Sequence, residues 1–337
     1  MPKKTSQTIT RRTFSASLAA IPLAAGASLG ATRPGMAQAN YPTKPVTVVL
    51  PFGAGGMADV SSRLAAEKLS EKLGQRFVIE NKPGAGGITA ARAVLAAAAD
   101  GYTLGLVTNG TSISAALFKA LPFDPVKQFD TISMMGVFEL VFLTAADSPY
   151  KTLQDFITAA TAQPGKLNVG TVNVGSTQHL GAELFKSSAG LNFQIIPHRT
   201  TPEITVAMLR NDVQLVVEFP AAVRGIINDK KARALATSGT SRSQAMPDVP
   251  TVAEAGVPGY EVISWNGFFG PSGIPKEVID TVNKAMREIM ADEAVKKRYA
   301  ALGIEAKASS PEELKARLAG DIKKWGDVIQ RAGIPKQ

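Results

Sequence analysis

The chain of 337 residues contains no cysteine and only two histidines. The lack of cysteine excludes disulfides, thiolate catalysis, cysteine–zinc sites and a lipidated amino-terminal cysteine. Two histidines without a clustered carboxylate pattern also argue against a metal site, so we expect neither a metal nor any other cofactor. Beyond the amino-terminal segment, no run approaches the roughly 20 apolar residues that a membrane-spanning helix needs.

The first 39 residues have the pattern of an export signal. A basic start with Lys3, Lys4, Arg11 and Arg12 precedes an uncharged stretch rich in alanine and leucine, and Ala37-Gln38-Ala39 fits a cleavage site. The paired arginines predict the twin-arginine pathway, with an ordinary Sec signal as the alternative. We therefore predict that residues 1–39 are a signal peptide and that the mature chain lies outside the bacterial cytoplasm.

The mature chain carries only a mild excess of positive charge. The whole sequence has 37 basic and 28 acidic residues. Removal of the five basic residues of the signal peptide leaves 32 basic against 28 acidic residues, a net charge of +4 rather than +9. Because this excess is spread along the chain, it argues against a nucleic-acid-binding surface and is compatible with small anionic ligands.

The mature sequence begins with a strand, a glycine-rich turn and a helix. The strand Val46–Leu50 runs into Pro51, and three glycines follow before an amphipathic helix over Ala58–Leu73. A helix that starts at such a turn directs free backbone N–H groups and the positive end of its dipole outward, which favours an anion. The alternative is a tight turn that binds nothing.

Two further strands and turns repeat this pattern. Phe77–Glu80 and Leu104–Val107 are short apolar runs, and a helix over Thr89–Ala99 separates them. The order βαβαβ predicts a parallel sheet. Each strand is followed by a polar or glycine-rich turn, first Asn81–Gly87 and then Thr108–Ser112. Since the carboxyl ends of parallel strands meet at one edge, we expect these turns to form a binding edge.

The second half of the chain predicts another α/β series. Val137–Thr144 is a long apolar run that we expect to form one strand, and the stretch Trp265–Pro271 is aromatic and glycine-rich. The remaining expected elements are helices at 153–162, 178–189, 202–210, 221–228, 276–290, 292–302 and 311–332, and strands at 167–170, 193–197, 213–218 and 232–237.

This series predicts two α/β lobes. Lobe 1 comprises residues 40–142 plus 238–337, and lobe 2 comprises residues 143–237. The chain would cross between them near Leu140–Thr144 and return near Leu235–Ser238, and two crossings make a hinge. A cleft between two such lobes is a natural ligand site.

The loop Gly170–Thr177 is the counterpart of the opening turn in lobe 2. It joins a strand to a helix and combines glycines with the hydroxyls of Thr171, Ser176 and Thr177. Its N–H and O–H donors suit a carboxylate. The alternative is a helix that is simply well capped. No lysine of the P-loop type follows either glycine-rich turn, which disfavours nucleoside triphosphates.

Several stretches together resemble one family. They are Pro51-Phe52-x-x-Gly55-Gly56-x-x-Asp59, Asn81-Lys82-Pro83-Gly84-Ala85-Gly86-Gly87, Gly175-Ser176-x-x-His179-Leu180-x-x-Glu183, Arg233-Ala234-Leu235-Ala236, Pro247-Asp248-x-Pro250-Thr251-x-x-Glu254-x-Gly256 and Trp265-x-Gly267. The chain resembles the solute-binding proteins of tripartite tricarboxylate transporters, also called the Bug or TctC family. The resemblance covers essentially the whole mature chain.

This resemblance implies an α/β fold of the type II periplasmic binding proteins, a two-lobed Venus flytrap with a hinge of two crossing strands. It also implies capture of a small carboxylate in the periplasm and delivery to a membrane permease of two subunits. Main-chain groups and ordered waters of the loop with Gly55 and Asp59 would meet the ligand carboxylate. The Gly175-Ser176 loop would meet it from lobe 2.

One segment departs from the family pattern. Where the family usually has Val-Pro-Tyr-Lys-Gly, this chain has Ile196-Pro197-His198-Arg199-Thr200. The change puts the identity of the ligand in doubt more than the fold. Arg199 would either pair with a second carboxylate or lie in solvent at the rim. Glu218, which ends a strand, would either bind a ligand amine or hydroxyl or hold the hinge.

We therefore expect a binding protein that acts as a monomer, without catalysis and without nucleic acid. The candidate ligand-binding residues are Phe52, Ala54, Gly55, Asp59, Asn109, Thr111, Thr171, Gly175, Ser176, Thr177, His198 and Glu218. His179 is expected to be a packed or loop-bonding histidine.

Three other classes of protein are alternatives to a solute-binding protein. An exported NAD(P)-dependent oxidoreductase would use Gly53, Gly55 and Ala58 for the pyrophosphate and Glu80 for the ribose, although Asn81–Gly87 is long for a ribose-reading loop. A serine hydrolase is disfavoured because Gly-x-Ser-x-Gly is absent around Ser176. An interaction protein that feeds a sensor kinase would use the same cleft.

Overall fold

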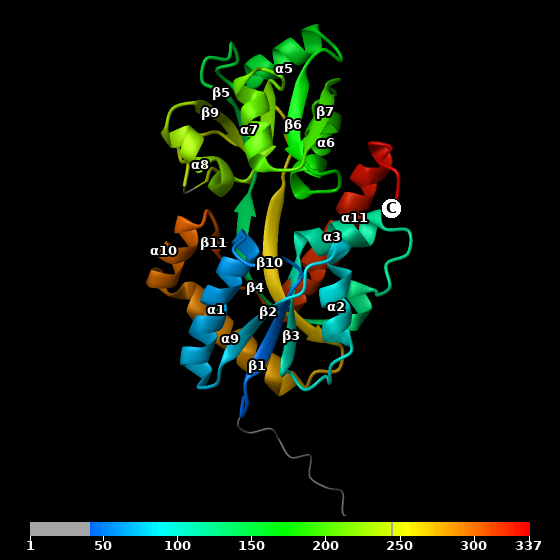
Figure 1. Cartoon of the computed structure of the whole chain (residues 1–337), viewed down its shortest axis with the longest axis vertical. Coiled ribbons are helices and arrows are strands. Elements are labelled where there is room, and N and C mark those ends of the chain that lie inside the picture. The colour runs from blue at the N-terminus through cyan, green and yellow to red at the C-terminus, as the bar shows by residue number, and fades with distance from the viewer. Residues whose placement is uncertain (1–40, 244) are drawn as a thin grey trace, which may run out of the picture. The chain divides into compact units, whose positions relative to one another are not determined.

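The computed structural model describes residues 41–243 and 245–337. The predicted signal peptide, residues 1–39, lies outside the described residues. Residues 40–337 belong to one unit by their contacts. This unit contains two β-sheets, each with its own helices, and we call them lobe 1 and lobe 2 (Figure 1).

Lobe 1 is built on a six-stranded sheet of order β11-β4-β10-β3-β1-β2. Strands β1, β2 and β3 are parallel to one another, as the βαβαβ pattern predicts, and β10 is antiparallel to both β3 and β4. The strands are β1 (Val46–Leu50), β2 (Phe77–Asn81), β3 (Thr103–Thr108), β4 (Phe129–Glu139), β10 (Ile263–Pro271) and β11 (Glu305–Ala306).

Helices cover both faces of this sheet. On one face, α1, α9 and α10 pack against Val46, Val48 and Leu50 of β1. On the other face, Val49 belongs to an apolar cluster that also contains residues of α2 and α11, because successive side chains of a strand point to opposite faces. The helices of lobe 1 are α1 (Met57–Leu73), the 3₁₀ turn η1 (Ala85–Gly87), α2 (Ile88–Leu95), α3 (Asn109–Leu117), α4 (Pro125–Gln128), α9 (Lys276–Ala291), α10 (Glu293–Ala301) and α11 (Pro311–Arg331).

Lobe 2 is built on a five-stranded sheet of order β7-β6-β8-β5-β9. Helices α5 and α6 pack on one face of the sheet, and α7 and α8 pack on the other. The elements are β5 (Val141–Ala145), α5 (Leu153–Ala162), β6 (Asn168–Val172), α6 (Thr177–Ser188), β7 (Gln194–His198), α7 (Thr201–Leu209), β8 (Leu215–Glu218), α8 (Pro220–Asn228) and β9 (Ala232–Thr237).

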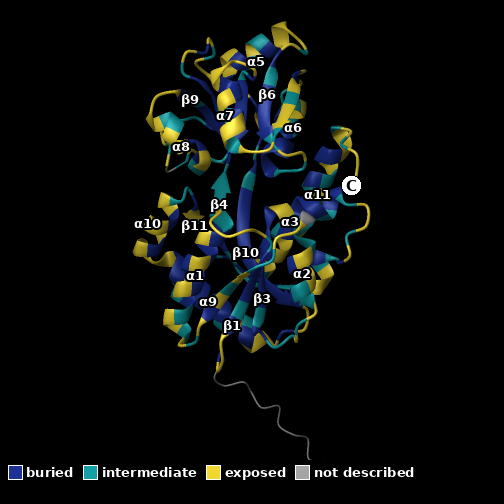
Figure 2. Cartoon of the chain, viewed as in Figure 1, coloured by how far each residue is buried: buried dark blue, intermediate teal, exposed yellow. Residues whose placement is uncertain are grey.

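The apolar core of lobe 2 continues into helices of lobe 1. Ile113 and Leu117 of α3 and Trp325 and Val328 of α11 belong to the same buried cluster as the inner faces of α5 and α6. Figure 2 shows the buried strands inside each lobe and the exposed outer faces of the helices. One flank of the junction between the lobes is therefore a continuous apolar core.

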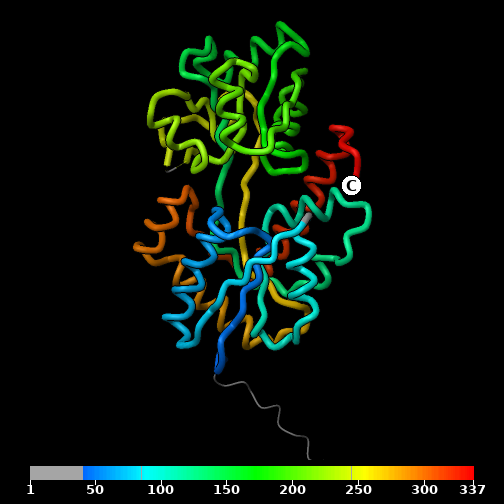
Figure 3. The backbone as a smooth tube through the Cα atoms, in the orientation of Figure 1, coloured from blue at the N-terminus to red at the C-terminus, as the bar shows by residue number. Residues whose placement is uncertain are grey.

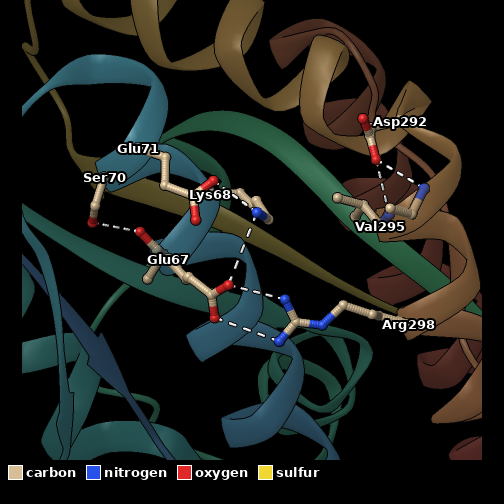
Figure 4. Close-up of polar contacts among 9 residues, drawn as sticks. Glu67, Lys68, Ser70, Glu71, Asp292, Val295 and Arg298 are labelled. Carbon is tan, nitrogen blue, oxygen red and sulfur yellow. Dashed lines mark hydrogen bonds and ion pairs between the residues drawn. The ribbon is translucent and has the colours of Figure 1, made fainter.

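An exposed network of ion pairs joins α1 to α10. Arg298 donates to both carboxylate oxygens of Glu67, at 2.9 and 3.4 Å, and Lys68 bonds Glu71 at 2.7 Å (Figure 4). Because about half of each of the side chains of Arg298 and Glu67 is exposed, this pair contributes little to stability.

The chain passes between the lobes twice (Figure 3). It leaves lobe 1 at Leu140, between β4 and β5, and re-enters the first sheet at Ile263. Ser238 ties the crossing segments together, because its N–H and C=O bond the backbone of Leu140 and Val262, both at 2.9 Å. The segment between Ser238 and Ile263 stays beside lobe 2, where Val252 packs in its core. The predicted boundary at 237/238 thus marks the end of β9, 25 residues before the chain joins the lobe 1 sheet.

Two predictions of secondary structure were wrong. The apolar run Val137–Thr144 is not one strand, since Leu140 separates β4 from β5 and each belongs to a different sheet. The aromatic stretch Trp265–Pro271, for which no element was predicted, is most of β10, an interior strand of lobe 1. Helix α2 also ends at Leu95, four residues before the predicted end.

Candidate functional site

The first candidate loop is held in shape by Asp59. The backbone N–H of Gly55 donates to Oδ2 of Asp59 at 2.9 Å, and Gly55 has a φ of +87° that favours glycine. The side-chain amide of Asn81 donates to Oδ1 of Asp59 at 2.9 Å and to the carbonyl of Phe52 at 3.0 Å. Asp59 and Asn81 therefore fold the loop into one defined conformation, while Ala54 and Phe52 remain exposed at its tip.

The charge of Asp59 is neutralised by Arg63, one helical turn further along α1. Arg63 donates to the two carboxylate oxygens at 3.0 and 2.9 Å. These bonds, with those from Gly55 and Asn81, outweigh burial and lower the pKa of Asp59 to about 2. The loop thus carries an internal ion pair and no excess negative charge.

Helix α1 begins at this loop without a side-chain cap. Its N-cap residue is Gly56, and no side chain accepts a hydrogen bond there. The first N–H groups of a helix have no partner within the helix, and together they carry partial positive charge. The amino terminus of α1 is therefore available to an anion.

The third loop of lobe 1 reaches lobe 2 through Asn109. Thr108 and Thr111 cap α3 with a reciprocal capping box. Asn109 is fully buried. Its amide donates to the hydroxyl of Thr177 at 3.0 Å, and its carbonyl accepts from the indole of Trp325 at 2.8 Å. Asn109 thus joins α3, α6 and α11 at the junction of the lobes.

Replacement of Asn109 by alanine is expected to lower the free energy of unfolding by about 1–2 kcal/mol. The indole N–H of Trp325 would lose its acceptor while it remains buried, and such an orphaned group costs about 1–3 kcal/mol. Urea unfolding measures the change. Asn192→Ala, at an exposed position of lobe 2, is the matched control, and equal stability of the two variants would contradict the bridging role.

The facing loop of lobe 2 lies directly against α3. A Cβ atom added to Gly175 would meet Cδ2 of Leu117 at 2.7 Å, so the loop and α3 approach closely. Ser176 caps α6: its hydroxyl accepts from the N–H of His179 at 3.1 Å and donates to the carbonyl of Val172 at 3.1 Å. The single hydroxyl proton of Ser176 is therefore engaged. The hydroxyl of Thr171 is buried and has no hydrogen-bond partner among the described residues.

The residues that depart from the family pattern lie on an edge strand and a helix cap. His198 is partly exposed at the end of β7, and its Nδ1 lies 2.9 Å from the carbonyl of Ile196. Arg199 is exposed. Thr200 is the N-cap of α7, where its hydroxyl accepts from the N–H of Glu203. Thr200 thus supplies a side-chain cap that a glycine at this position would lack.

Glu218 is buried at the end of β8, with an exposed fraction of 1%. Its Oε1 accepts from the amide of Gln178 and from the N–H of Phe219, both at 2.7 Å. Its Oε2 accepts from the hydroxyl of Thr201 at 2.8 Å.

Gln178 and Thr201 are absent from the predicted set of ligand-binding residues, and Asn81 was assigned only to a turn. The signal for Asn81 was its place at the carboxyl end of a parallel strand.

The structure thus links some predicted residues and leaves others apart. Phe52, Gly55 and Asp59 form one bonded loop, and Asn109 joins Thr177 across the lobes. The side-chain hydrogen bond of His198 goes to the carbonyl of Ile196, which is not a candidate residue. The predicted ligand-binding roles of all twelve residues stay predictions.

His179 is a packed histidine. It is 5% exposed, and burial lowers its pKa. Its Nδ1 has no hydrogen-bond partner among the described residues.

A cavity of about 1020 Å³ lies elsewhere at the junction of the lobes. It is lined by the end of β4, by α8, by residues 239–243 and by α10 and β11, and by none of the twelve candidate residues. Phe138 lines it and packs edge-on against Phe219 at 5.1 Å between ring centroids. Arg224 crosses the junction on this flank, because its Nη1 donates to the carbonyl of Ala301 at 2.8 Å. The sequence predicted a cleft between the lobes, but no residue that lines this cavity was among the candidate residues.

In residues 41–243 and 245–337, no group of three or more His, Cys, Asp or Glu side chains gathers closely enough to hold a metal ion. Of the helices that the structure describes, none combines the length and the apolar character needed to cross a membrane.

Comparison with known proteins matches residues 61–334 to the family described as "Tripartite tricarboxylate transporter family receptor". Protein BugT of Bordetella pertussis is 31% identical over 296 residues, which are 87% of this chain and 91% of BugT. The structure of R. palustris Rpa4515 with adipate has a TM-score of 0.75 and 31% identity, and the match covers 88% of this chain and 99% of that one. MatC from Rhodopseudomonas palustris with bound malate has a TM-score of 0.71 and 30% identity, over 86% and 100% of the two chains. These likenesses confirm the two-lobed fold of the type II binding proteins.

Proposed function

Because the chain belongs to the tripartite tricarboxylate transporter receptor family, we propose that it is a periplasmic solute-binding protein for a small carboxylate. The protein would capture the carboxylate between its lobes and deliver it to a two-subunit membrane permease. Capture requires no catalysis. The solved relatives with adipate and malate support carboxylate binding.

One observation carries the proposal most directly: the uncapped amino terminus of α1 behind a loop whose own charges cancel. Asp59 and Arg63 neutralise each other, and the N-cap Gly56 has no side-chain partner. An anion at this position would meet free N–H donors and a helix dipole without repulsion from Asp59. The ligand carboxylate is therefore assigned to lobe 1.

Closure would place lobe 2 over the other end of the ligand. Strands β6, β7 and β8 are parallel to one another, and the loops that follow them lie at one edge of the lobe 2 sheet, opposite the loops of lobe 1 (Figure 1). The α3–α6–α11 flank is a continuous core, so the lobes would pivot beside it. The ligand shifts this equilibrium only by binding the closed state more tightly than the open one.

A thermal-shift screen of the purified protein against carboxylates, with NAD and NADP included, tests the proposal. A ligand at 100 times its Kd stabilises the folded protein by about 2.7 kcal/mol, which is an easily measured rise in Tm. A rise with one carboxylate class is the expected result. A rise with NAD or NADP alone would instead support the oxidoreductase alternative. If nothing raises Tm, mass spectrometry of the denatured protein would show whether a ligand was bound already, and its absence would contradict the proposal.

A further inference from the structure

The carboxylate of Glu218 lies where three helices of lobe 2 begin. Its three hydrogen bonds come from Gln178 in the first turn of α6, from Thr201, the first residue of α7, and from the N–H of Phe219, the N-cap of α8. The amino ends of helices are partially positive. In lobe 2, the positive ends of these three helices therefore already interact with a carboxylate of the protein itself, that of Glu218.

No cation balances Glu218. Its partners are an amide, a hydroxyl and a backbone N–H, and all of them donate to it, which is how an ionised carboxylate is bound. In the described ranges 41–243 and 245–337, no lysine, arginine or histidine forms an ion pair with it. The carboxyl end of β8 in lobe 2 thus carries a buried negative charge.

The two lobes therefore differ in charge. In lobe 1 the buried acid Asp59 has Arg63 as its counterion, and the uncapped start of α1 is free. In lobe 2 the buried acid Glu218 has no counterion among the residues that the structure describes, and α6 and α7 are capped by Ser176 and Thr200. A ligand between them would place its carboxylate against lobe 1, and its other end would lie in the field of Glu218.

We infer that Glu218 sets the ligand class of this site: a carboxylate whose far end bears a hydrogen-bond donor, an amine or a hydroxyl, and not a second carboxylate. The inference rests on the proposed function. Two like charges in a partly buried site repel, whereas an ammonium or hydroxyl group is attracted to the same carboxylate. Oε2 of Glu218 accepts only the bond from Thr201, so it retains acceptor capacity.

Four ligands of equal chain length test this preference: adipate, hexanoate, 6-hydroxyhexanoate and 6-aminohexanoate. A second series of succinate, butyrate, 4-hydroxybutyrate and 4-aminobutyrate covers a shorter ligand. Titration calorimetry with the purified protein should give the donor-bearing acids a Kd at least about tenfold below that of the dicarboxylate in one series. The amino and hydroxy members show which donor is preferred.

Glu218→Gln keeps the shape of the side chain and removes its charge. We expect it to tighten binding of the dicarboxylate by about tenfold and to erase the advantage of the amino acid. Glu218→Asp, which keeps the charge, should retain the order of the wild-type protein. Glu183→Gln removes a charge from the same lobe, beyond the first turn of α6, and should leave the order unchanged.

The outcomes separate the two proposals. Tighter binding of adipate or succinate by the wild-type protein would overturn the inference and leave carboxylate binding intact. If Arg199→Ala abolished that preference, the exposed arginine would be the residue that reads a second carboxylate. Binding of no carboxylate in either series or in the wider screen would overturn both. If Glu218→Gln fails to fold, the order of the matched ligands on the wild-type protein still decides.

Discussion

Replacement of Asp59 by alanine should raise the Kd for the bound carboxylate by about tenfold to a hundredfold. The side chain of Asp59 does not need to touch the ligand to have this effect. It accepts hydrogen bonds from Gly55 and Asn81 and pairs with Arg63, so its removal frees the loop that presents the amino terminus of α1. Reordering a few backbone residues on binding costs about 1–2 kcal/mol for each.

The same variant should lose stability in a pH-dependent way. The folded-state pKa of Asp59 is lowered to about 2 from an ordinary value near 3.8, chiefly by Arg63. A lowered pKa stabilises the folded protein at pH values above the unfolded-state value, by about 2 kcal/mol for this shift. The stability difference between wild type and Asp59→Ala should therefore contain a part of about 2 kcal/mol that is full above about pH 5 and is lost as the pH falls through about 2. The loss of the hydrogen bonds from Gly55 and Asn81 adds a part that does not depend on pH in this way.

Calorimetry with a carboxylate from the screen and urea unfolding at several pH values measure both effects. Glu71→Ala removes an exposed acidic residue from the same helix and serves as the control. An unchanged Kd in Asp59→Ala would show that the ligand does not depend on this loop. A stability difference that did not shrink between neutral pH and about pH 2 would contradict the assigned ion pair.

The sequence was informative where local rules decide the structure. Val46–Leu50 is a run of strand-forming residues, and the glycines after it mark the turn, so the βαβαβ half and its glycine-rich loop followed from pattern and turn chemistry alone. The loop Gly170–Thr177 was expected either to bind a carboxylate or simply to cap a helix, and Ser176 does cap α6. Each of these features depends on residues within a few positions of one another.

Features that depend on distant residues could not be predicted. Val137–Thr144 reads as one apolar strand because Leu140 is as apolar as its neighbours, and only tertiary pairing with different sheets divides it. The antiparallel pairing of Trp265–Pro271 with β3 and β4 spans more than 120 residues. Sequence reasoning also could not find that Gln178 and Thr201 converge on Glu218, since they come from three separate segments.

Replacement of Ser238 by alanine should lower the free energy of unfolding by about 2–5 kcal/mol. The hydroxyl of Ser238 is fully buried; it accepts from the N–H of Leu140 at 2.7 Å and donates to the carbonyl of Val262. Alanine leaves both backbone groups buried without partners, and each orphaned group costs about 1–3 kcal/mol. The loss is large because the same hydroxyl serves both segments that cross between the lobes.

The position of Ser238 also predicts how the loss is distributed. Leu140 and Val262 are the points where the chain leaves and re-enters lobe 1, so the substitution should loosen the hinge more than either sheet. Hydrogen exchange of the backbone N–H of Leu140 should accelerate strongly, while that of the interior strand β1 should follow only the global loss of stability. Ser187→Ala, which removes an exposed hydroxyl bonded to Leu184 at the end of α6, should change stability by less than about 0.5 kcal/mol. Equal stability of the two variants would mean that the crossing segments are held by their backbone bonds to Ser238 alone, and the hinge would then tolerate any small residue at this position.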